Sequence, residues 1–102
     1  MPDNRGRPTE LEIQHAMEEY LRWTGWFVVP MNQQWALSYP GIADLYALKN
    51  SISVWFEVKK PKGKQSDNQK IFEADIKAKK GNYFVVVTIE DVEEAIRGLK
   101  WK

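Results

Sequence analysis

The stretch VWFEVKKPKGKQSDNQK, residues 54–70, decides the fold because it holds a strand, a loop and the start of a helix. β-Branched and aromatic residues favour a strand over residues 52–60. Ser66 is a typical N-cap for a helix over residues 66–80, and Gly81 suits the position where such a helix ends. The stretch therefore predicts a strand–loop–helix unit, which favours an α/β architecture.

Two of the charged residues in this largely apolar strand lie two positions apart. Alternate strand residues share a face, so Glu57 and Lys59 project on the same side as Trp55. The pair could be a plain ion pair, which contributes little to stability at a surface. Burial of such a pair without a purpose would be costly, however. The strand therefore raises the hypothesis of a functional site next to the core.

The rest of the chain divides into helices and strands of ordinary length. Residues 31–41 are expected to form a loop with at most a short strand piece. Apolar periodicity, caps and turn residues predict a helix at 10–25, strands at 26–30, 42–49 and 82–89, and a closing helix at 90–99. The order α-β-β-β-α-β-α predicts an α/β sandwich with a central mixed sheet. The last strand is nearly all apolar, which is typical of a strand buried on both faces.

A second acid comes close to Glu57 if a turn at residues 50–51 joins two strands as a hairpin. A two-residue loop pairs Lys49 with Ile52. Counted back without a bulge, Asp44 then falls opposite Glu57. Two carboxylates beside a lysine form an oxygen site for a hard divalent cation such as Mg²⁺, and the lysine could orient or activate a water or stabilise transition-state charge. An ordinary charged hairpin would show the same pattern.

Polar residues also extend the apolar stripes of two predicted helices. Glu10 and Gln14 lie one turn apart and continue the stripe of the first helix, although Glu10 could equally serve as a first-turn or capping residue. Gln69 shares a stripe with apolar residues of the second long helix, although its amide could simply bond to backbone. Such positions lie at the edge of the core, where a site would form.

These motifs together resemble a known family. PGIAD (residues 40–44), FEVKKPKGKQSDNQ (residues 56–69), a helix and an apolar strand follow one another as in the VRR-NUC domain of the PD-(D/E)xK nuclease superfamily. The resemblance runs from about Thr9 to Ile96, and the combination of motifs is far more specific than any one of them. VRR-NUC domains are similar to archaeal Holliday-junction resolvases. The resemblance implies a restriction-endonuclease-like α/β sandwich.

The resemblance also implies roles for single residues. Asp44 and Glu57 match metal ligands, and the backbone carbonyl of Val58 is implied as a third ligand. Lys59 matches the catalytic lysine, and Gln69 matches the glutamine of the family's helix. The implied metal is Mg²⁺ or Mn²⁺, and no small-molecule cofactor is expected.

Two further points concern how closely the chain follows the family. TELEIQ (residues 9–14) matches the opening helix, so Glu10 and Gln14 are both candidates to bind metal through water or to orient DNA. The family usually has proline before the aspartate, where this chain has Ala43. That difference removes a backbone constraint and no ligand.

The resemblance implies DNA as the substrate. Branched DNA such as four-way junctions is expected by analogy with the resolvases, and a homodimer would bring two sites to two strands. Stand-alone domains of this kind are typical of phages and prophages. We therefore expect a metal-dependent DNA endonuclease in the cytoplasm of a bacterial or phage-infected cell. The alternatives are a non-catalytic DNA-binding module that keeps the fold, and a structural protein in which the charged pair is incidental.

Charge and composition limit these possibilities. The net charge is only +1, but residues 59–80 hold eight lysines against three acids, which suits either a phosphate-binding surface or a solvated helix face. Lys60, Lys62 and Lys64 follow the strand directly and are candidates to hold phosphates beside the metal. The absence of cysteine excludes disulfides and cysteine-based zinc sites. No apolar run is long enough to suggest a membrane span.

The chain begins with a charged segment that contains Gly and Pro. Residues 1–8 are expected to form a loose leader, and residues 9–102 a single domain. His15 is the one histidine and is expected at the surface or in a capping role. Trp35 and Tyr39 precede the Asp44 strand and could contact DNA bases, a second subunit or the core.

Overall fold

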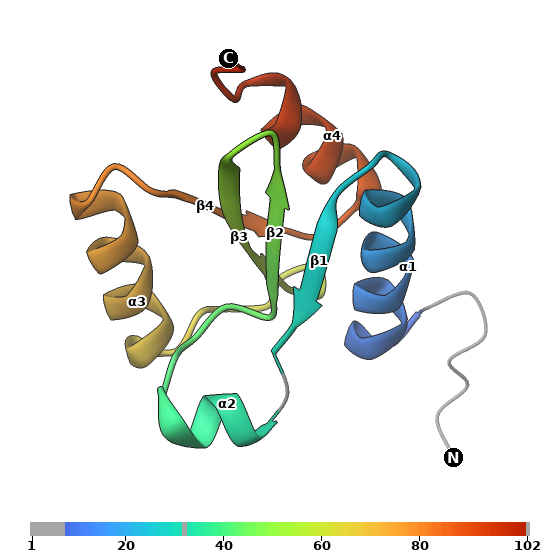
Figure 1. Cartoon of the computed structure of the whole chain (residues 1–102). Coiled ribbons are helices and arrows are strands. Elements are labelled where there is room, and N and C mark those ends of the chain that lie inside the picture. The colour runs from blue at the N-terminus through green and yellow to red at the C-terminus, as the bar shows by residue number, and fades with distance from the viewer. Residues whose placement is uncertain (1–7, 32, 102) are drawn as a thin grey trace.

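Helices cover both faces of one four-stranded sheet in the computed structural model, which describes residues 8–31 and 33–101 (Figure 1). The elements are α1 (Glu10–Trp23), β1 (Phe27–Pro30), α2 (Gln33–Ser38), β2 (Leu45–Lys49), β3 (Ile52–Val58), α3 (Asp67–Ala78), β4 (Asn82–Val86) and α4 (Ile89–Arg97). Their order agrees with the predicted order except for α2. That segment was expected to be a loop, and a helix of six residues is too short to show the apolar periodicity that would have revealed it.

The sheet has the strand order β1-β2-β3-β4. β1, β2 and β3 are antiparallel neighbours, and β2 and β3 are joined by a tight turn at Asn50 and Ser51. Both turn residues have positive φ, 51° and 68°, as the favoured two-residue hairpin turn requires. Lys49 pairs with Ile52, so the predicted hairpin register is confirmed.

The last strand lies at an edge of the sheet. β4 runs parallel to β3, and α3 makes the crossover between them. The expectation of a strand buried on both faces is wrong, because Val85 is 41% exposed. Phe84 and Val86 pack into the core on one face and Tyr83 packs on the other. The strand is apolar because helices cover part of each face, which composition alone cannot distinguish from a central position.

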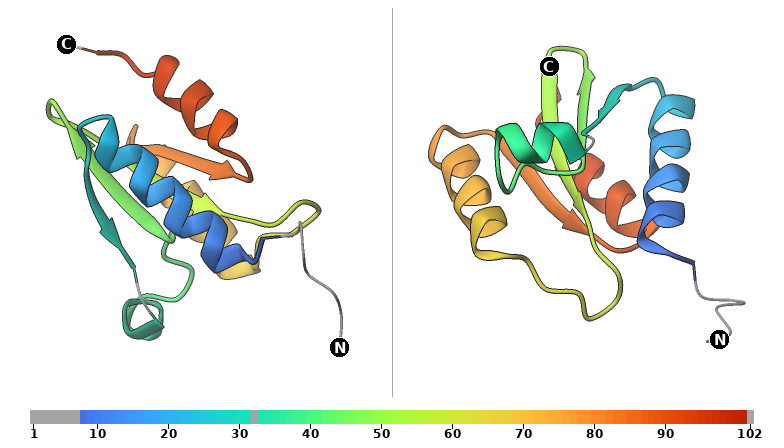
Figure 2. Two further views of the ribbon diagram at one scale, coloured as in Figure 1. Left: turned by 90° about the vertical axis from the view of Figure 1, so that its right-hand side faces the viewer. Right: turned by 90° about the horizontal axis from the view of Figure 1, so that it is seen from below.

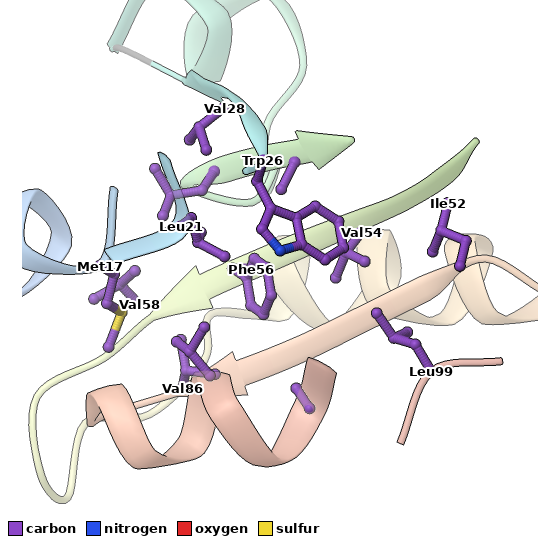
Figure 3. Packing of buried hydrophobic residues seen from close by; sticks show 14 residues of the cluster. Met17, Leu21, Trp26, Val28, Ile52, Val54, Phe56, Val58, Val86 and Leu99 are labelled. Carbon is purple, nitrogen blue, oxygen red and sulfur yellow. The ribbon is translucent and has the colours of Figure 1, made fainter. Parts of the chain in front are cut away.

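Two apolar clusters fill the spaces between the sheet and its helices. The larger one lies between one face of the sheet and helices α1 and α4. Its fully buried side chains include Met17, Leu21, Phe56 and Val58 (Figure 3). The smaller cluster joins Ala43, Phe72 and Tyr83 under α3 on the opposite face. The chain is thus an α/β sandwich with a mixed sheet, as the sequence predicts.

Hydroxyl side chains cap the starts of α1, α3 and α4. The Oγ atoms of Thr9, Ser66 and Thr88 each accept a hydrogen bond from a backbone N–H three residues further on. The Ser66 cap is the one expected from the sequence, and Thr9 is a plausible N-cap directly before the helix predicted from residue 10. Thr88 starts α4 before the predicted residue 90, and β4 consequently ends at Val86 rather than at residue 89.

The start of the chain is described only from Pro8 onward, so the predicted leader at residues 1–8 lies almost entirely outside the described residues. Across residues 8–31 and 33–101, no helix combines the length and the apolar character that crossing a membrane requires.

Candidate active site

Asp44 stands where the chain enters β2. Its backbone C=O accepts a hydrogen bond from Met31 N at 2.8 Å, which closes the segment that contains α2. Its side-chain Oδ2 accepts a hydrogen bond from Val58 N, also at 2.8 Å. Because Leu45 pairs with Phe56, this bond extends the β2–β3 pairing by one step. The Asp44 carboxylate is thereby tied to the end of β3.

Glu57 is completely buried near the end of β3, with an exposed fraction of 0%. Its Oε2 accepts a hydrogen bond from Gln69 Nε2 at 2.8 Å and lies 3.5 Å from Lys59 Nζ. Its Oε1 is buried and accepts no hydrogen bond, and no other side-chain nitrogen or oxygen of the described residues is buried without a partner. Only the protonated form of Glu57 can share a hydrogen bond with the Asp44 carboxylate. A buried polar atom without a partner is costly, so a ligand at this atom would be stabilising.

The surroundings of Glu57 oppose its negative charge. The pKa of its carboxyl is raised from 4.5 to about 8. Burial is the largest cause and the nearby Asp44 carboxylate is the second, whereas Lys59 acts in the opposite direction. A further positive charge beside Oε1 would favour the ionised carboxylate and lower its pKa again.

Gln69 fixes the orientation of Glu57 from the first turn of α3. Its Oε1 accepts a hydrogen bond from Ser66 N at 2.8 Å as part of a capping box. This bond directs the amide nitrogen of Gln69 to Glu57 Oε2. One side chain therefore both starts a helix and holds the buried carboxylate.

Gly41 brings the first turn of α3 against the segment that leads into β2. Its φ is +89°, a conformation that favours glycine, and a Cβ at this position would lie 2.2 Å from Asn68 O. Only glycine permits this approach of two backbones. The contact sets the position of Asp44, three residues further on, relative to Gln69.

Lys59 completes the group. Its side chain is 13% exposed, and its backbone N donates a hydrogen bond to Val86 O at 2.9 Å, which continues the pairing with β4. An ammonium has three N–H donors, so contact with one oxygen of Glu57 leaves donors for a further partner.

The donor set suits a hard divalent cation. Asp44 and Glu57 supply carboxylate oxygens, and the C=O of Val58 lies on the same side of β3 as its N–H, which bonds to Asp44. No group of three or more His, Cys, Asp or Glu side chains converges anywhere in the described part of the chain. Water and substrate would therefore supply the remaining ligands, which is the way Mg²⁺ is typically bound.

The predicted α1 residues make a different set of contacts. Among the described residues, no hydrogen bond or ion pair joins Glu10 or Gln14 to the carboxylates of β2 and β3, so their roles in the site stay predictions. Gln14 Nε2 donates to Glu18 Oε2 at 3.5 Å, and Arg22 Nη1 lies 3.3 Å from Glu18 Oε1. Sequence reasoning missed the buried acid Glu18. The spacing of four residues from Gln14 to Glu18 to Arg22 was the available signal.

The predicted phosphate-binding lysines lie on the loop between β3 and α3. Gly63 N donates a hydrogen bond to Lys60 O at 2.9 Å, and Lys62 has a φ of 65°, so the loop contains a tight turn. The side chains of Lys60, Lys62 and Lys64 are all exposed. Their contact with phosphates stays a prediction.

Three residues without an assigned role are also exposed. His15 is exposed on α1, in agreement with the expected surface position. Trp35 and Tyr39, on and directly after α2, are 53% and 51% exposed. Of the three roles considered for these aromatic residues, a place in the core is therefore wrong.

Comparisons with known proteins bear on the fold. No model of a protein family matches the sequence, and no curated protein matches it. Solved structures do match. One of them, described as a VRR_NUC domain, shares 22% sequence identity with a TM-score of 0.75, and the match covers 89% of this chain and 97% of that one. This chain therefore has the fold of a VRR_NUC domain, which confirms at the level of fold the resemblance seen in its motifs.

Proposed function

We propose that this chain is a metal-dependent DNA endonuclease that hydrolyses phosphodiester bonds, preferentially in branched DNA. The observation that carries the proposal is the buried Glu57 carboxylate with an unpartnered Oε1, beside Asp44 and Lys59. A purely structural ion pair would be expected to have both of its buried oxygens bonded. The likeness in fold to a VRR_NUC domain supports a nuclease-type protein.

Asp44, Glu57 and the Val58 carbonyl are the groups that would hold Mg²⁺ or Mn²⁺. When bound, the cation supplies Lewis-acid polarisation of the phosphodiester and a lower pKa for water. Gln69 keeps Glu57 in one orientation through its hydrogen bond to Oε2 and leaves Oε1 available. The hydrogen bond between Val58 N and Asp44 Oδ2 holds the second carboxylate at the end of the same strand.

Lys59 acts on the attacking water and on the phosphate. One of its N–H donors orients the water, whose oxygen forms the new bond to phosphorus while the bond to the leaving sugar oxygen breaks. The attacking water releases a proton to solvent, and the leaving oxygen takes one from solvent. Its positive charge stabilises the negative charge that develops on the phosphoryl oxygens. The products are a phosphate monoester and a free hydroxyl. The near burial of Lys59 strengthens both interactions, because water screens them less.

The exposed lysines of the following loop hold the DNA next to this site, since phosphate contacts position a nucleic acid without reading its sequence. We propose a homodimer whose two sites cut two strands, which suits four-way junctions. Sedimentation velocity of the free protein would test the dimer.

Cleavage of end-labelled DNA tests the activity. Four-way junction, flap and linear duplex substrates with the same arm sequences are incubated with Mg²⁺, Mn²⁺ or EDTA. The wild type should cut with either metal, cut the junction best and cut nothing in EDTA. Lys59→Ala should abolish cleavage. The matched change Lys60→Ala, one residue further on, should weaken binding but keep most of the cleavage.

Two other outcomes would overturn the proposal. Binding without cleavage by the wild type, unchanged by EDTA and by Glu57→Gln, would identify a DNA-binding module that keeps the fold. Absence of both binding and cleavage would leave the charged pair incidental.

A further inference from the structure

The segment around α2 is tied to the candidate active site at both of its ends. The hydrogen bond from Met31 N to Asp44 O closes it at the entrance to β2. At the far end of α2, the ring of Tyr39 packs edge-on against Phe72 of α3, with centroids 5.7 Å apart. Gly41 then presses against Asn68. The helix is therefore supported by the elements that carry Asp44 and Gln69.

This supported segment presents apolar side chains to solvent. Leu37 is 83% exposed, and Trp35 and Tyr39 are each about half exposed. Trp35 and Tyr39 are one turn apart, whereas Leu37 is two residues from each and so lies on the other side of the helix. Apolar side chains exposed this close together on one short helix are typical of a surface that another molecule contacts. Something is therefore expected to cover α2 from two directions.

The position and charge of α2 indicate what covers it. α2 stands off from the sheet at the end where β3 passes into the lysine-bearing loop (Figures 1 and 2). Residues 31–43 contain no charged residue, so no formal charge in the segment repels or attracts phosphate. Backbone phosphates suit the lysines of the loop, whereas an uncharged apolar element suits the faces of bases.

A second copy of the chain fits this element less well. Aromatic side chains bury 150–250 Å² each when fully covered, so the three exposed side chains offer roughly 400 Å². A stable protein interface needs about 800 Å² on each partner. An apolar element with two sides also suits insertion between separating strands, as apolar wedges do in DNA complexes, better than a flat contact.

We propose that α2 inserts at a branch point, where it receives the unpaired bases next to the scissile phosphate. Leu37 separates the bases on one side of the helix, and the half-exposed side chains of Trp35 and Tyr39 contact them on the other. This inference rests on the proposed nuclease function and deepens it, because it assigns the preference for branched DNA to one element.

Binding in EDTA separates this inference from the cleavage reaction. A splayed-arm DNA and a fully paired duplex of the same arm sequence are titrated with protein, and binding is followed by fluorescence anisotropy. 2-Aminopurine at the unpaired position next to the branch reports stacking. The variants are Leu37→Ala and Trp35→Ala. The matched control is Trp23→Ala, which removes a tryptophan that is 91% exposed at the end of α1 near Lys49, far from the end of β3.

Leu37→Ala and Trp35→Ala should each weaken binding of the splayed-arm DNA by about tenfold, leave duplex binding within about twofold, and reduce the 2-aminopurine signal. Trp23→Ala should change none of these. Equal effects on both DNAs, no effect of Leu37→Ala, or no preference of the wild type for the splayed arm would overturn the inference. So would dissociation of a dimer by Leu37→Ala, because a second copy would then be the occupant.

The proposed function can fail separately from this inference. A wild type that cuts no DNA, but loses its splayed-arm preference through Leu37→Ala, would refute the endonuclease and keep the role of α2. Metal-dependent cleavage with an unchanged substrate preference in Leu37→Ala would support the endonuclease and refute the role of α2.

Discussion

Glu57→Gln should change how the folding stability of the metal-free protein depends on pH. The pKa of the Glu57 carboxyl is raised from 4.5 to about 8, mainly by burial and then by Asp44. Between these two values the folded protein keeps a proton that the unfolded chain has released, so stability falls as pH rises. Each pKa unit corresponds to about 1.4 kcal/mol, so the wild type should lose roughly 3 kcal/mol by pH 7. The loss should reach roughly 4 to 5 kcal/mol by pH 9.

Urea unfolding in EDTA, followed by tryptophan fluorescence at pH 5, 7 and 9, measures this loss. Glu57→Gln has no proton to release at this position. The free energy of unfolding of the variant minus that of the wild type should therefore increase by about 2 to 3 kcal/mol between pH 5 and pH 7. Glu73→Gln is the matched control. Lys77 lowers the pKa of Glu73, so the contribution of Glu73 is lost only as pH falls below about 4.5, and its difference from the wild type should stay flat.

Parallel stability curves for Glu57→Gln and the wild type from pH 5 to pH 9 would refute this reasoning, because Glu57 would then be ionised in the folded protein. Added Mn²⁺ supplies a second check. A cation at Oε1 favours the ionised form, so Mn²⁺ should restore stability to the wild type at pH 8 and have little effect on Glu57→Gln.

Three further predictions concern other parts of the site. Gly41→Ala should cost about 2 to 4 kcal/mol of stability, from its positive φ and from the backbone contact at 2.2 Å, whereas Gly25→Ala should cost about 1 to 2 kcal/mol because it meets only a flexible lysine. Equal losses in urea unfolding would contradict a special role for the Gly41 contact. Gln69→Glu keeps a residue that can complete the capping box but brings a further carboxylate to Glu57. It should therefore destabilise the metal-free protein by about 1 to 3 kcal/mol at pH 8 and by less at pH 5. A destabilisation that does not change with pH would contradict repulsion between the two carboxylates. Lys60, Lys62 and Lys64, all exposed on the loop, are replaced together with alanine. The slope of log K against log salt concentration for DNA binding should then become less steep by about 0.9 for each phosphate that the protein no longer neutralises. An unchanged slope would show that these lysines do not contact the DNA.

Local rules explain why much of this fold could be predicted from the sequence. The strand alternation around Glu57 and the two-residue turn at Asn50 depend on neighbouring residues, and both predict the register that the sheet shows. The caps Thr9 and Ser66 are equally local. The edge position of β4 is not, because it depends on which strands pair across the whole sheet. A single apolar run cannot specify that arrangement.

The candidate site divides in the same way. Asp44 and Glu57 could be brought together by counting along a hairpin, and the structure places them at adjoining strand ends. The unpartnered Oε1 could not be predicted, because it depends on which oxygen of Glu57 the Gln69 side chain of α3 contacts. The Gly41 contact with Asn68 is likewise a contact between distant segments. Buried Glu18 was missed because a glutamate is rarely buried unless it is paired, and its pairing with Arg22 was not considered.

The choice of glutamine at position 69 connects the fold to the site. Glutamate and glutamine can both complete a capping box with Ser66, since each offers an oxygen to the N-cap N–H. The other terminal atom of the Gln69 side chain, Nε2, lies 2.8 Å from Glu57 Oε2. An N–H donor at this position stabilises the Glu57 carboxylate, whereas the oxygen of a glutamate would repel it. Helix formation alone therefore does not require glutamine at position 69. Holding the buried Glu57 carboxylate in one orientation does require a side chain with an N–H donor there. Because this bond and the Lys59 ion pair both fall on Oε2 and leave Oε1 without a donor, α3 holds Glu57 in an orientation that suits the proposed role as a metal ligand.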